Sequence, residues 1–413
     1  MTASPAVAAL VAAWSVVLLV VVLLEVFEVM LLPRRVRRRL RFVRFYFRGT
    51  WRVWRGIAAA LPARWRPEAL AGYGPLSMVG LLSAWTFLLV TGFGCLQWAL
   101  HQLGDAVADP PSLLNQLYFS GVTFFTLGYG DVTAATRAGK VVSVLEAGIG
   151  FGFIAIVIGY LPVLYQLFSQ REVRVIRLDA RAGSPPTAAA LLERHAGAQG
   201  MAALGELLTE WEEWAAELLE SHLSYPMLAY YRSQHDNESW LAALTAVTDA
   251  AALIMVGLER TGTRAAEARG STHGGAHGVG DDVPRFQARI TFASARLTIV
   301  EMARVLGEAP VRPGAPSSGT DRLPPEAFAA LSARLAAAGL CLRDPDGSQA
   351  ALRRARAAYE PHLAALADRL LLPLPPWTRP ADAPDNWEQD APGARDLYEA
   401  AEAREVAEGS AVD

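Results

Sequence analysis

The stretch VTFFTLGYGDVT, Val122 to Thr133, decides the fold of this chain. It lies between two apolar segments that are each long enough to cross a bilayer. Its centre, Gly128-Tyr129-Gly130, is followed at once by the carboxylate of Asp131. Non-helical backbone at membrane depth is tolerated only where it is buried in protein or lines a water-filled path. We therefore expect this stretch to lie on the axis of a pore.

Apolar residues are unevenly distributed along the chain. They make up 52% of the 413 residues and concentrate in the N-terminal part. Three segments reach the roughly 20 apolar residues that a membrane-spanning helix needs, namely 6–32, 75–100 and 138–168. No Lys or Arg precedes Arg34, so the first segment is predicted to be a retained helix rather than a cleaved signal peptide. A membrane portion followed by a soluble one is expected.

The arginines set the expected orientation. Twelve of them fall between Arg34 and Arg66, directly after the first apolar segment, and REVRVIR at 171–177 follows the third. The loop 101–136 between the second and third segments has no Lys or Arg. Because cytoplasmic loops carry the excess of basic residues, we expect a multi-pass protein of the cell membrane. Its N-terminus is predicted to lie outside and its C-terminal portion in the cytoplasm.

The residues before and within the opening stretch suit cation passage. SLLNQLYFSGVTF, Ser112 to Phe124, is too short to cross the membrane and too apolar for an exposed loop, which predicts a re-entrant helix. A cation that leaves its water shell needs rings of oxygen, and backbone carbonyls form them when successive peptides face one side. Glycine permits the positive φ that this needs, so Gly128 and Gly130 are expected at alternate positions. Thr126 would add a ring of hydroxyls.

These residues resemble the selectivity filter of the potassium-channel family, whose signature is T-V-G-Y-G. The resemblance covers roughly 75–168, and TLGYGD departs from the family's T-V-G-Y-G-D only at Leu127. It implies an all-α pore unit of two membrane helices and a re-entrant helix, here with an extra helix before it. One filter per chain implies a homotetramer. The implied filter comprises Thr126, Leu127, Gly128, Tyr129 and Gly130, and its potassium ligands are the carbonyls of the first four with the Thr126 hydroxyl.

Three positions near the filter depart from the family. At Leu127 the carbonyl is expected to bind the ion while the side chain packs behind the filter. Phe125 stands where the family usually has a second threonine. Val122 stands where some members carry a carboxylate that pairs with the aspartate after the filter, so Asp131 is expected to lack that partner. The resemblance implies potassium as the permeant ion, and we expect no cofactor.

The third apolar segment is predicted to line the inner cavity and to carry the gate. The resemblance implies a gating hinge at an inner-helix glycine, for which Gly150 is the nearest candidate, although close helix packing explains this glycine equally well. Pro162 is predicted to kink the helix. Glu146 is an intramembrane carboxyl, which indicates a functional role. It is expected to hydrogen-bond behind the filter, to face the cavity, or to be a protonated acid satisfied by the re-entrant helix.

The basic segment after the first helix is predicted to lie at the inner membrane surface. On a helical wheel its arginines form one stripe and its apolar residues lie on the other side, as in an amphipathic interfacial helix that binds anionic lipids. A voltage sensor is the alternative, because Arg38, Arg41 and Arg44 recur every third residue. Glu25 and Glu28 are expected to reach towards Arg34 and Arg35. The arginines expected to face lipid are Arg38, Arg41, Arg44, Arg48 and Arg52.

The C-terminal portion is predicted to be helical. Apolar residues at helical spacing predict helices at 186–196, 201–222, 238–267, 284–307, 325–342 and 349–371. Trp240 to Leu258 is nearly long enough to span a membrane, but Asp249 in its middle favours a buried core or interface helix. The segment 220–240 has a composition typical of a ligand or subunit surface, or of aromatic packing around Pro226. Whether this portion binds an unidentified cytoplasmic ligand is left open.

The sequence therefore predicts an all-α membrane channel with a helical cytoplasmic domain. No nucleophile–base arrangement and no nucleotide-binding motif is seen, so neither enzymatic activity nor a nucleic-acid partner is expected. The alternatives are a weakly selective cation channel and a non-conducting membrane scaffold. The predicted divisions are a membrane helix (1–33), a basic interfacial segment (34–72), the pore domain (73–170), the cytoplasmic domain (171–375) and a Pro-rich, acidic tail (376–413).

Overall fold

The computed structural model of the chain describes residues 4–32, 42–104, 112–234, 238–261, 283–307 and 321–379. The chain divides into two compact units, Met1–Phe168 and Ser169–Asp413. We call the first the membrane unit and the second the C-terminal unit.

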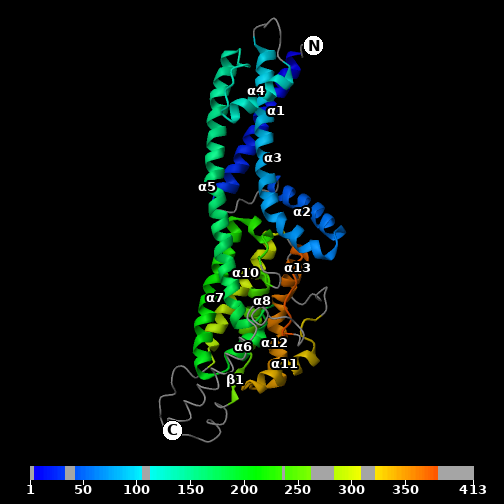
Figure 1. Cartoon of the computed structure of the whole chain (residues 1–413), viewed down its shortest axis with the longest axis vertical. Coiled ribbons are helices and arrows are strands. Elements are labelled where there is room, and N and C mark those ends of the chain that lie inside the picture. Colours follow the sequence, from blue (N-terminus) through cyan, green and yellow to red (C-terminus); the bar gives the residue numbers. More distant parts are fainter. Residues whose placement is uncertain are drawn as a thin grey trace. The chain divides into compact units, whose positions relative to one another are not determined.

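The membrane unit is built from helices (Figure 1). Its elements are α1 (Pro5–Met30), α2 (Phe42–Ala60), the 3-10 turn η1 (Ala63–Trp65), α3 (Arg66–Leu103), α4 (Leu113–Phe124) and the first part of α5 (Arg137–Ala182). Among the described residues, three helical stretches are long and apolar enough to cross a membrane, namely α1, α3 with η1, and α5. The all-α membrane fold predicted from the sequence is confirmed.

Helix α3 is the element around which the membrane unit packs. Helix α1 lies along it (Figure 1), and at Gly92 the two helices approach so closely that an added Cβ would come within 2.8 Å of the Leu19 side chain. Helix α2 also docks on α3, because the Tyr46 hydroxyl donates to the Ser77 carbonyl at 2.9 Å. Small residues allow such close approach where lipid offers no hydrophobic driving force.

The predicted spans are the apolar parts of longer helices. Helix α3 begins at Arg66 rather than at Pro75, and α5 continues to Ala182 rather than ending at Phe168. Helix α5 is continuous through Pro162. A kink at that residue stays a prediction.

The C-terminal unit is a helical bundle whose described residues include one short strand pair. After the last part of α5 it contains α6 (Ala188–Arg194), α7 (Ala198–Ser224), η2 (Pro226–Tyr230), α8 (Trp240–Met255), β1 (Leu258–Arg260), α10 (Arg285–Val305), α11 (Pro325–Ala337), β2 (Leu340–Leu342), α12 (Pro345–Ala357) and α13 (Glu360–Leu370). Helix α8 is buried from Trp240 to Ile254 and packs against α10. Its burial agrees with the predicted core helix.

Two of the predicted helices end early, and a third, predicted at 349–371, is two helices, α12 and α13. The helices expected to continue to residues 267 and 342 end at Met255 and Ala337 instead. Gly257 and Gly339 follow with φ of 114° and 82°, conformations that suit glycine and end a helix. The chain then forms β1 and β2, which pair antiparallel with Leu258 opposite Leu342.

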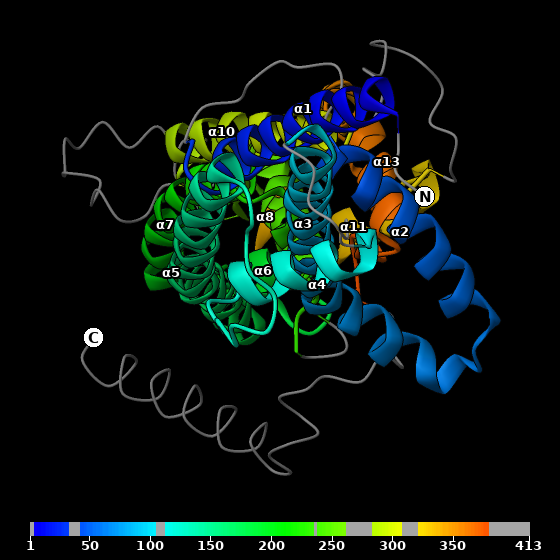
Figure 2. The ribbon, with the colours of Figure 1, turned by 90° about the horizontal axis from the view of Figure 1, so that it is seen from above.

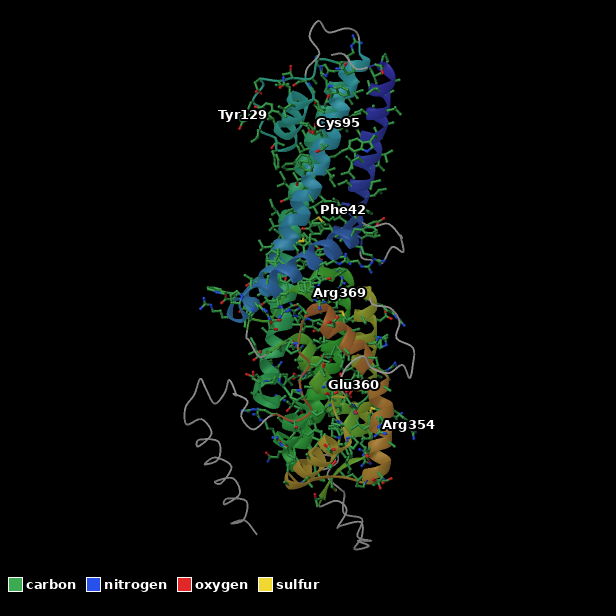
Figure 3. All side chains as sticks on the ribbon, turned by 90° about the vertical axis from the view of Figure 1, so that its right-hand side faces the viewer. Phe42, Cys95, Tyr129, Arg354, Glu360 and Arg369 are labelled. Atoms are coloured by element: carbon green, nitrogen blue, oxygen red, sulfur yellow. The ribbon has the colours of Figure 1, made fainter. Side chains whose placement is uncertain are left out.

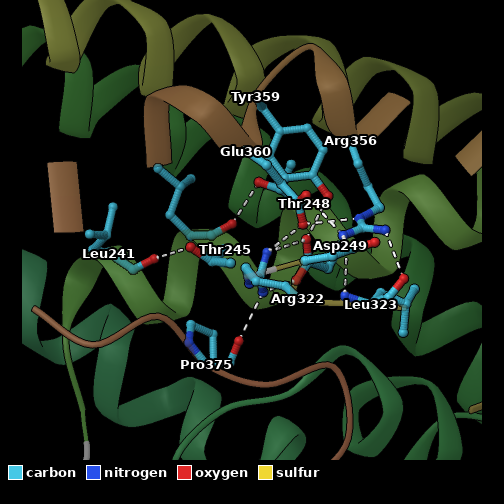
Figure 4. A network of polar contacts seen from close by, with 12 residues as sticks. Leu241, Thr245, Thr248, Asp249, Arg322, Leu323, Arg356, Tyr359, Glu360 and Pro375 are labelled. Atoms are coloured by element: carbon cyan, nitrogen blue, oxygen red, sulfur yellow. Dashed lines mark hydrogen bonds and ion pairs between the residues drawn. The ribbon is translucent and has the colours of Figure 1, made fainter. Parts of the chain in front are cut away.

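A buried polar network holds the C-terminal unit together (Figure 4). Asp249, wholly buried on α8, accepts hydrogen bonds from Arg322 at 2.6 Å and from the Tyr359 hydroxyl at 2.6 Å. Arg322 also binds Glu360 at 3.0 Å, and Glu360 in turn binds Arg356 at 3.0 Å. Because every charge has a hydrogen-bonded partner of opposite sign, the network can stay ionised away from water.

Replacing Asp249 by Ala is expected to lower the free energy of unfolding by about 3–5 kcal/mol, because it leaves Arg322 buried without its main partner. The matched control is Glu193→Ala, which breaks an ion pair with Arg334 whose side chain is 43% exposed. Exposed pairs contribute only about 0–1 kcal/mol. Denaturant unfolding of the full chain compares the two variants, and equal losses would contradict the assignment.

Candidate ion-conduction site

Helix α4 leads directly into the predicted filter segment, Thr126 to Gly130. The Ser112 hydroxyl caps its N-terminus by accepting from the Asn115 amide at 3.2 Å. At its C-terminus the Thr126 and Leu127 amides turn back to the carbonyls of Thr123 and Val122, at 3.0 and 2.8 Å. The helix spans Leu113–Phe124, and in the view from above it lies beside α3 (Figure 2). The backbone therefore leaves helical geometry directly before TLGYGD.

The backbone of the predicted filter segment alternates in handedness. Positive φ values recur at every second residue, with 57° at Thr126, 60° at Gly128 and 78° at Gly130. Alternation of left- and right-handed residues turns successive peptide carbonyls towards one side, which is the arrangement that rings of cation ligands require. The two glycines adopt this conformation freely. Thr126 adopts it at a cost, because a β-branched residue with positive φ is strained.

The predicted filter segment is exposed in the single chain. Every residue from Phe125 to Asp131 is exposed, and Figure 3 shows Tyr129 projecting from the edge of the membrane unit. The side chains of Leu127 and Tyr129 are 54% and 66% exposed. Leu127 was expected to pack behind the filter, and its own chain does not cover it.

Asp131 has a neighbour that the sequence did not reveal. The Tyr118 hydroxyl of α4 interacts with the Asp131 carboxylate. Tyr118 lies one helical turn before Val122, on the same face of α4. The expectation concerned only a carboxylate at the position of Val122, and Tyr118 is a partner of a different kind. The four-residue spacing was the available signal.

Glu146 lies buried against α4. Its side chain is fully buried, and the Ser120 hydroxyl is in hydrogen-bond contact with its Oε1. Ser120 also lies 2.8 Å from the Val90 carbonyl of α3. Three arrangements were predicted for Glu146. The structure agrees with contact between Glu146 and the re-entrant helix, and the side chain does not face open space.

Gly150 lets the end of α4 seat directly on α5. A Cβ added at Gly150 would collide with the carbonyl oxygen of Phe124 and would lie 2.9 Å from its carbonyl carbon. Gly148, Gly152 and Gly159 have no such neighbour within 4 Å. Of the two explanations for Gly150, close packing is thus observed, while a hinge at this residue stays a prediction.

Helix α2 carries the described part of the basic segment. Arg38 and Arg41 lie outside the described residues; Arg44 and Arg52 are exposed, and Arg48 is half-buried. The helix has three faces rather than the two expected. One is buried and includes Phe47, Trp51 and Ala58, one is basic, and the third exposes Phe45, Val53 and Ile57.

Glu25 makes a contact with α2 that the sequence did not predict. Glu25 of α1 accepts a hydrogen bond from the Val43 amide at 2.8 Å, and it thereby caps the N-terminal turn of α2. A carboxylate is favourable there because the helix dipole is positive at that end. Arg34 and Arg35, the expected partners of Glu25 and Glu28, lie outside the described residues, so those contacts stay a prediction.

In the described part of the chain, no group of three or more His, Cys, Asp and Glu side chains could hold a metal ion.

Replacing Gly150 by Ala is expected to push α4 away from α5 and to lower the melting temperature of the purified protein by several degrees, because the new methyl group meets backbone that cannot rotate aside. Gly152→Ala is the matched control. It adds the same methyl group where nothing lies within 4 Å, and Ala favours helix. Thermal unfolding in detergent measures both, and a harmless Gly150→Ala would contradict the packing contact.

Comparison with known proteins agrees with this geometry. The family model described as "Ion channel" matches residues 86–166. The uncharacterized membrane protein YdjJ of Bacillus subtilis (strain 168) is 24% identical over 198 residues, which are 46% of this chain and 56% of that protein. The two pore potassium channel c of rice, Oryza sativa subsp. japonica, is 44% identical over 64 residues, 16% of this chain and 14% of that one.

A third relative is covered more fully. Protein LctB of Bacillus caldotenax is 31% identical over 93 residues, which are 20% of this chain and 69% of that protein. The chain spans less than two thirds of the length of the Bacillus subtilis and rice relatives. No solved structure matches the chain. With the re-entrant helix and filter segment lying between two membrane helices within the matched residues, the chain belongs to the ion-channel family with a two-helix pore unit, to which it adds an apolar helix at its N-terminal side.

Proposed function

We propose that the protein is a potassium-selective channel that conducts K⁺ passively through the TLGYGD segment. The observation that carries the proposal is the alternation of positive φ at Thr126, Gly128 and Gly130 directly after a re-entrant helix. The dipole of α4 supports it, because the C-terminal end of a helix favours a cation. The ion ligands are the carbonyls from Thr126 to Tyr129 and the Thr126 hydroxyl. Gly130 completes the filter, and Asp131 lies at its outer mouth.

The pore is formed by four copies of the chain. One chain supplies one filter strand and leaves the run from Phe125 to Asp131 exposed. Four such strands around a common axis would surround an ion with oxygen and would cover the apolar side chains of Leu127 and Tyr129. Cyclic symmetry is the usual way in which identical chains build a closed ring.

The membrane orientation and lipid contacts follow from charge. We place the N-terminus outside and the C-terminal unit in the cytoplasm of a cell membrane, because the basic residues follow α1 and the apolar part of α5. The exposed basic and apolar faces of α2 suit the boundary between anionic lipid headgroups and acyl chains. Arg44, Arg48 and Arg52, with Arg38 and Arg41 before them, would bind the headgroups.

Arg171 is the proposed link between gating and the C-terminal unit. It lies on α5 directly after the apolar segment, and its buried guanidinium donates to the carbonyls of Leu228 at 2.9 Å and Tyr231 at 2.6 Å. A rearrangement of η2 would therefore pull on α5. Gly150 and Pro162 are the residues at which we propose that α5 bends when it is pulled. Met227 to Tyr230 in η2 are buried, which supports packing within the chain over a ligand or subunit surface as the reason for the composition of this segment.

His222 is buried beside this link. Its ring is 5.5 Å from that of Trp240, and its Nδ1 lies 2.8 Å from the Leu218 carbonyl. Burial and then the charge of Arg171 lower the pKa of His222 to about 3, against the opposing hydrogen bond to Leu218. In the unfolded chain the pKa of histidine is about 6.5. The unfolded chain therefore binds a proton at His222 that the folded chain does not.

Potassium selectivity is expected from purified protein reconstituted in liposomes. With K⁺ on one side and Na⁺ on the other, the reversal potential should follow K⁺. Gly130→Ala should lower the K⁺ flux at least tenfold, because φ of 78° strains alanine. Gly148→Ala is the control, since its Cβ has open space. A reversal potential near zero would favour a weakly selective cation channel, and no flux under any voltage, pH or lipid composition would favour a scaffold.

Stability is expected to fall as the pH falls from about 6.5 towards 3, because protonation of His222 then favours the unfolded chain. Between pH 7 and pH 5 the effect of this one residue is about 2 kcal/mol. Unfolding of the full chain at the two pH values measures it in the wild type and in His222→Gln, where the dependence should shrink. His362→Gln, which changes a less buried histidine, should leave most of it. An undiminished dependence in His222→Gln would contradict the assignment.

A further inference from the structure

The contact between α4 and α5 repeats at two successive helical turns. Ser120 and Phe124 are four residues apart on α4, and Glu146 and Gly150 are four residues apart on α5, so each pair lies on one face of its helix. Ser120 contacts Glu146, and the Phe124 carbonyl lies against Gly150. These two contacts hold the last turn of α4 against α5 immediately before the predicted filter begins.

The protons at the contact between Ser120 and Glu146 can be counted. Ser120 has one hydroxyl proton, but its Oγ is in hydrogen-bond contact with two oxygens, the Val90 carbonyl at 2.8 Å and Glu146 Oε1. Both would be acceptors if Glu146 were ionised, and one contact would then lack a proton. A protonated Glu146 completes both contacts, because it donates to Ser120 Oγ while the Ser120 hydroxyl donates to the Val90 carbonyl.

Burial favours the same arrangement. Ser120 and Glu146 both have 0% exposure, and Glu146 Oε2 has no hydrogen-bond partner in the part of the chain that the structure describes. An ionised carboxylate in this place would have neither a cation nor a second donor to stabilise it, which makes the charged form costly. The neutral acid needs only one acceptor, and Ser120 Oγ provides it.

We propose that Glu146 is a filter-positioning residue that acts as a neutral hydrogen-bond donor. The chain of hydrogen bonds from Glu146 through Ser120 to Val90 joins α5, α4 and α3 at one level and fixes the end of α4 from which the filter starts. Glu146 touches no permeating ion; it acts through Ser120. The consequence for conduction rests on the proposed potassium-channel function, whereas the hydrogen-bond chain itself does not.

A neutral donor is distinguished from a charge by substitution. In Glu146→Gln the amide still donates to Ser120, so the K⁺/Na⁺ permeability ratio of the reconstituted protein should stay within twofold of the wild type. In Glu146→Ala the donor is lost, and the ratio should fall at least tenfold. Leu145→Ala is the control on the same helix, because Leu145 is 58% exposed and lies outside this contact.

A second measurement does not require conduction. Hydrogen exchange of the Thr126 and Leu127 amides, which close the end of α4, should quicken at least tenfold in Glu146→Ala and stay near wild type in Glu146→Gln. A wild type without K⁺ flux would end the proposed function, and exchange would still test the hydrogen-bond chain. If Glu146→Ala does not fold, Ser120→Ala replaces it with the same expected exchange.

Two results would overturn the inference. Equal impairment of Glu146→Gln and Glu146→Ala would mean that the negative charge is required. Wild-type behaviour of Glu146→Ala in exchange, or of Ser120→Ala where that variant replaces it, would mean that the chain of hydrogen bonds does not position the filter. Rescue by Gln together with loss in Ala supports the donor.

Discussion

Backbone polar groups at membrane depth must find partners, and this requirement shapes the whole membrane unit. Helix α4 ends at Phe124, and the three amides after it, those of Phe125, Thr126 and Leu127, still donate back into the helix. The carbonyl groups from Gly128 to Asp131 accept no hydrogen bond from a helix amide of the described residues. Such carbonyls are tolerable where they meet water or a cation. The positive φ of Thr126 and of the two glycines turns these carbonyls to one side, and at Thr126 this conformation is strained.

Close contacts fix the helices around the predicted filter segment to one another. Helix α4 is fixed to α3 where Gly94 brings the two backbones close, since an added Cβ would lie 2.9 Å from Leu117 Cα. Gln97 fixes α3 to α5 by donating to the Gly139 carbonyl at 3.0 Å and to the Ser143 hydroxyl at 2.9 Å. These contacts use small residues and polar side chains rather than bulk, as membrane interiors require.

Much of this organisation could be predicted from local patterns. The re-entrant helix predicted at 112–124 is found at 113–124, and glycine identity predicted the positive φ at Gly128 and Gly130. Contacts between distant segments could not be predicted. Asp249 and Arg322 are 73 residues apart, and pairing of Leu258 with Leu342 ended two helices that periodicity had extended. Tyr118 was missed for another reason, because the family comparison directed attention to Val122. The predicted ion ligands themselves remain predictions.

One uninterrupted helix has a mechanical consequence. Helix α5 runs for 46 residues from Arg137 to Ala182, a length of about 70 Å at 1.5 Å per residue. Glu146 and Gly150 near one end grip the pore helix, and Arg171 near the other end is clamped by backbone carbonyls of η2. Each of these contacts fixes which face of α5 is turned towards its own neighbour, because residues four apart lie on one face of a helix. A substitution at either contact would therefore change the rotation of α5 about its axis at that level, and not only its distance from the neighbour.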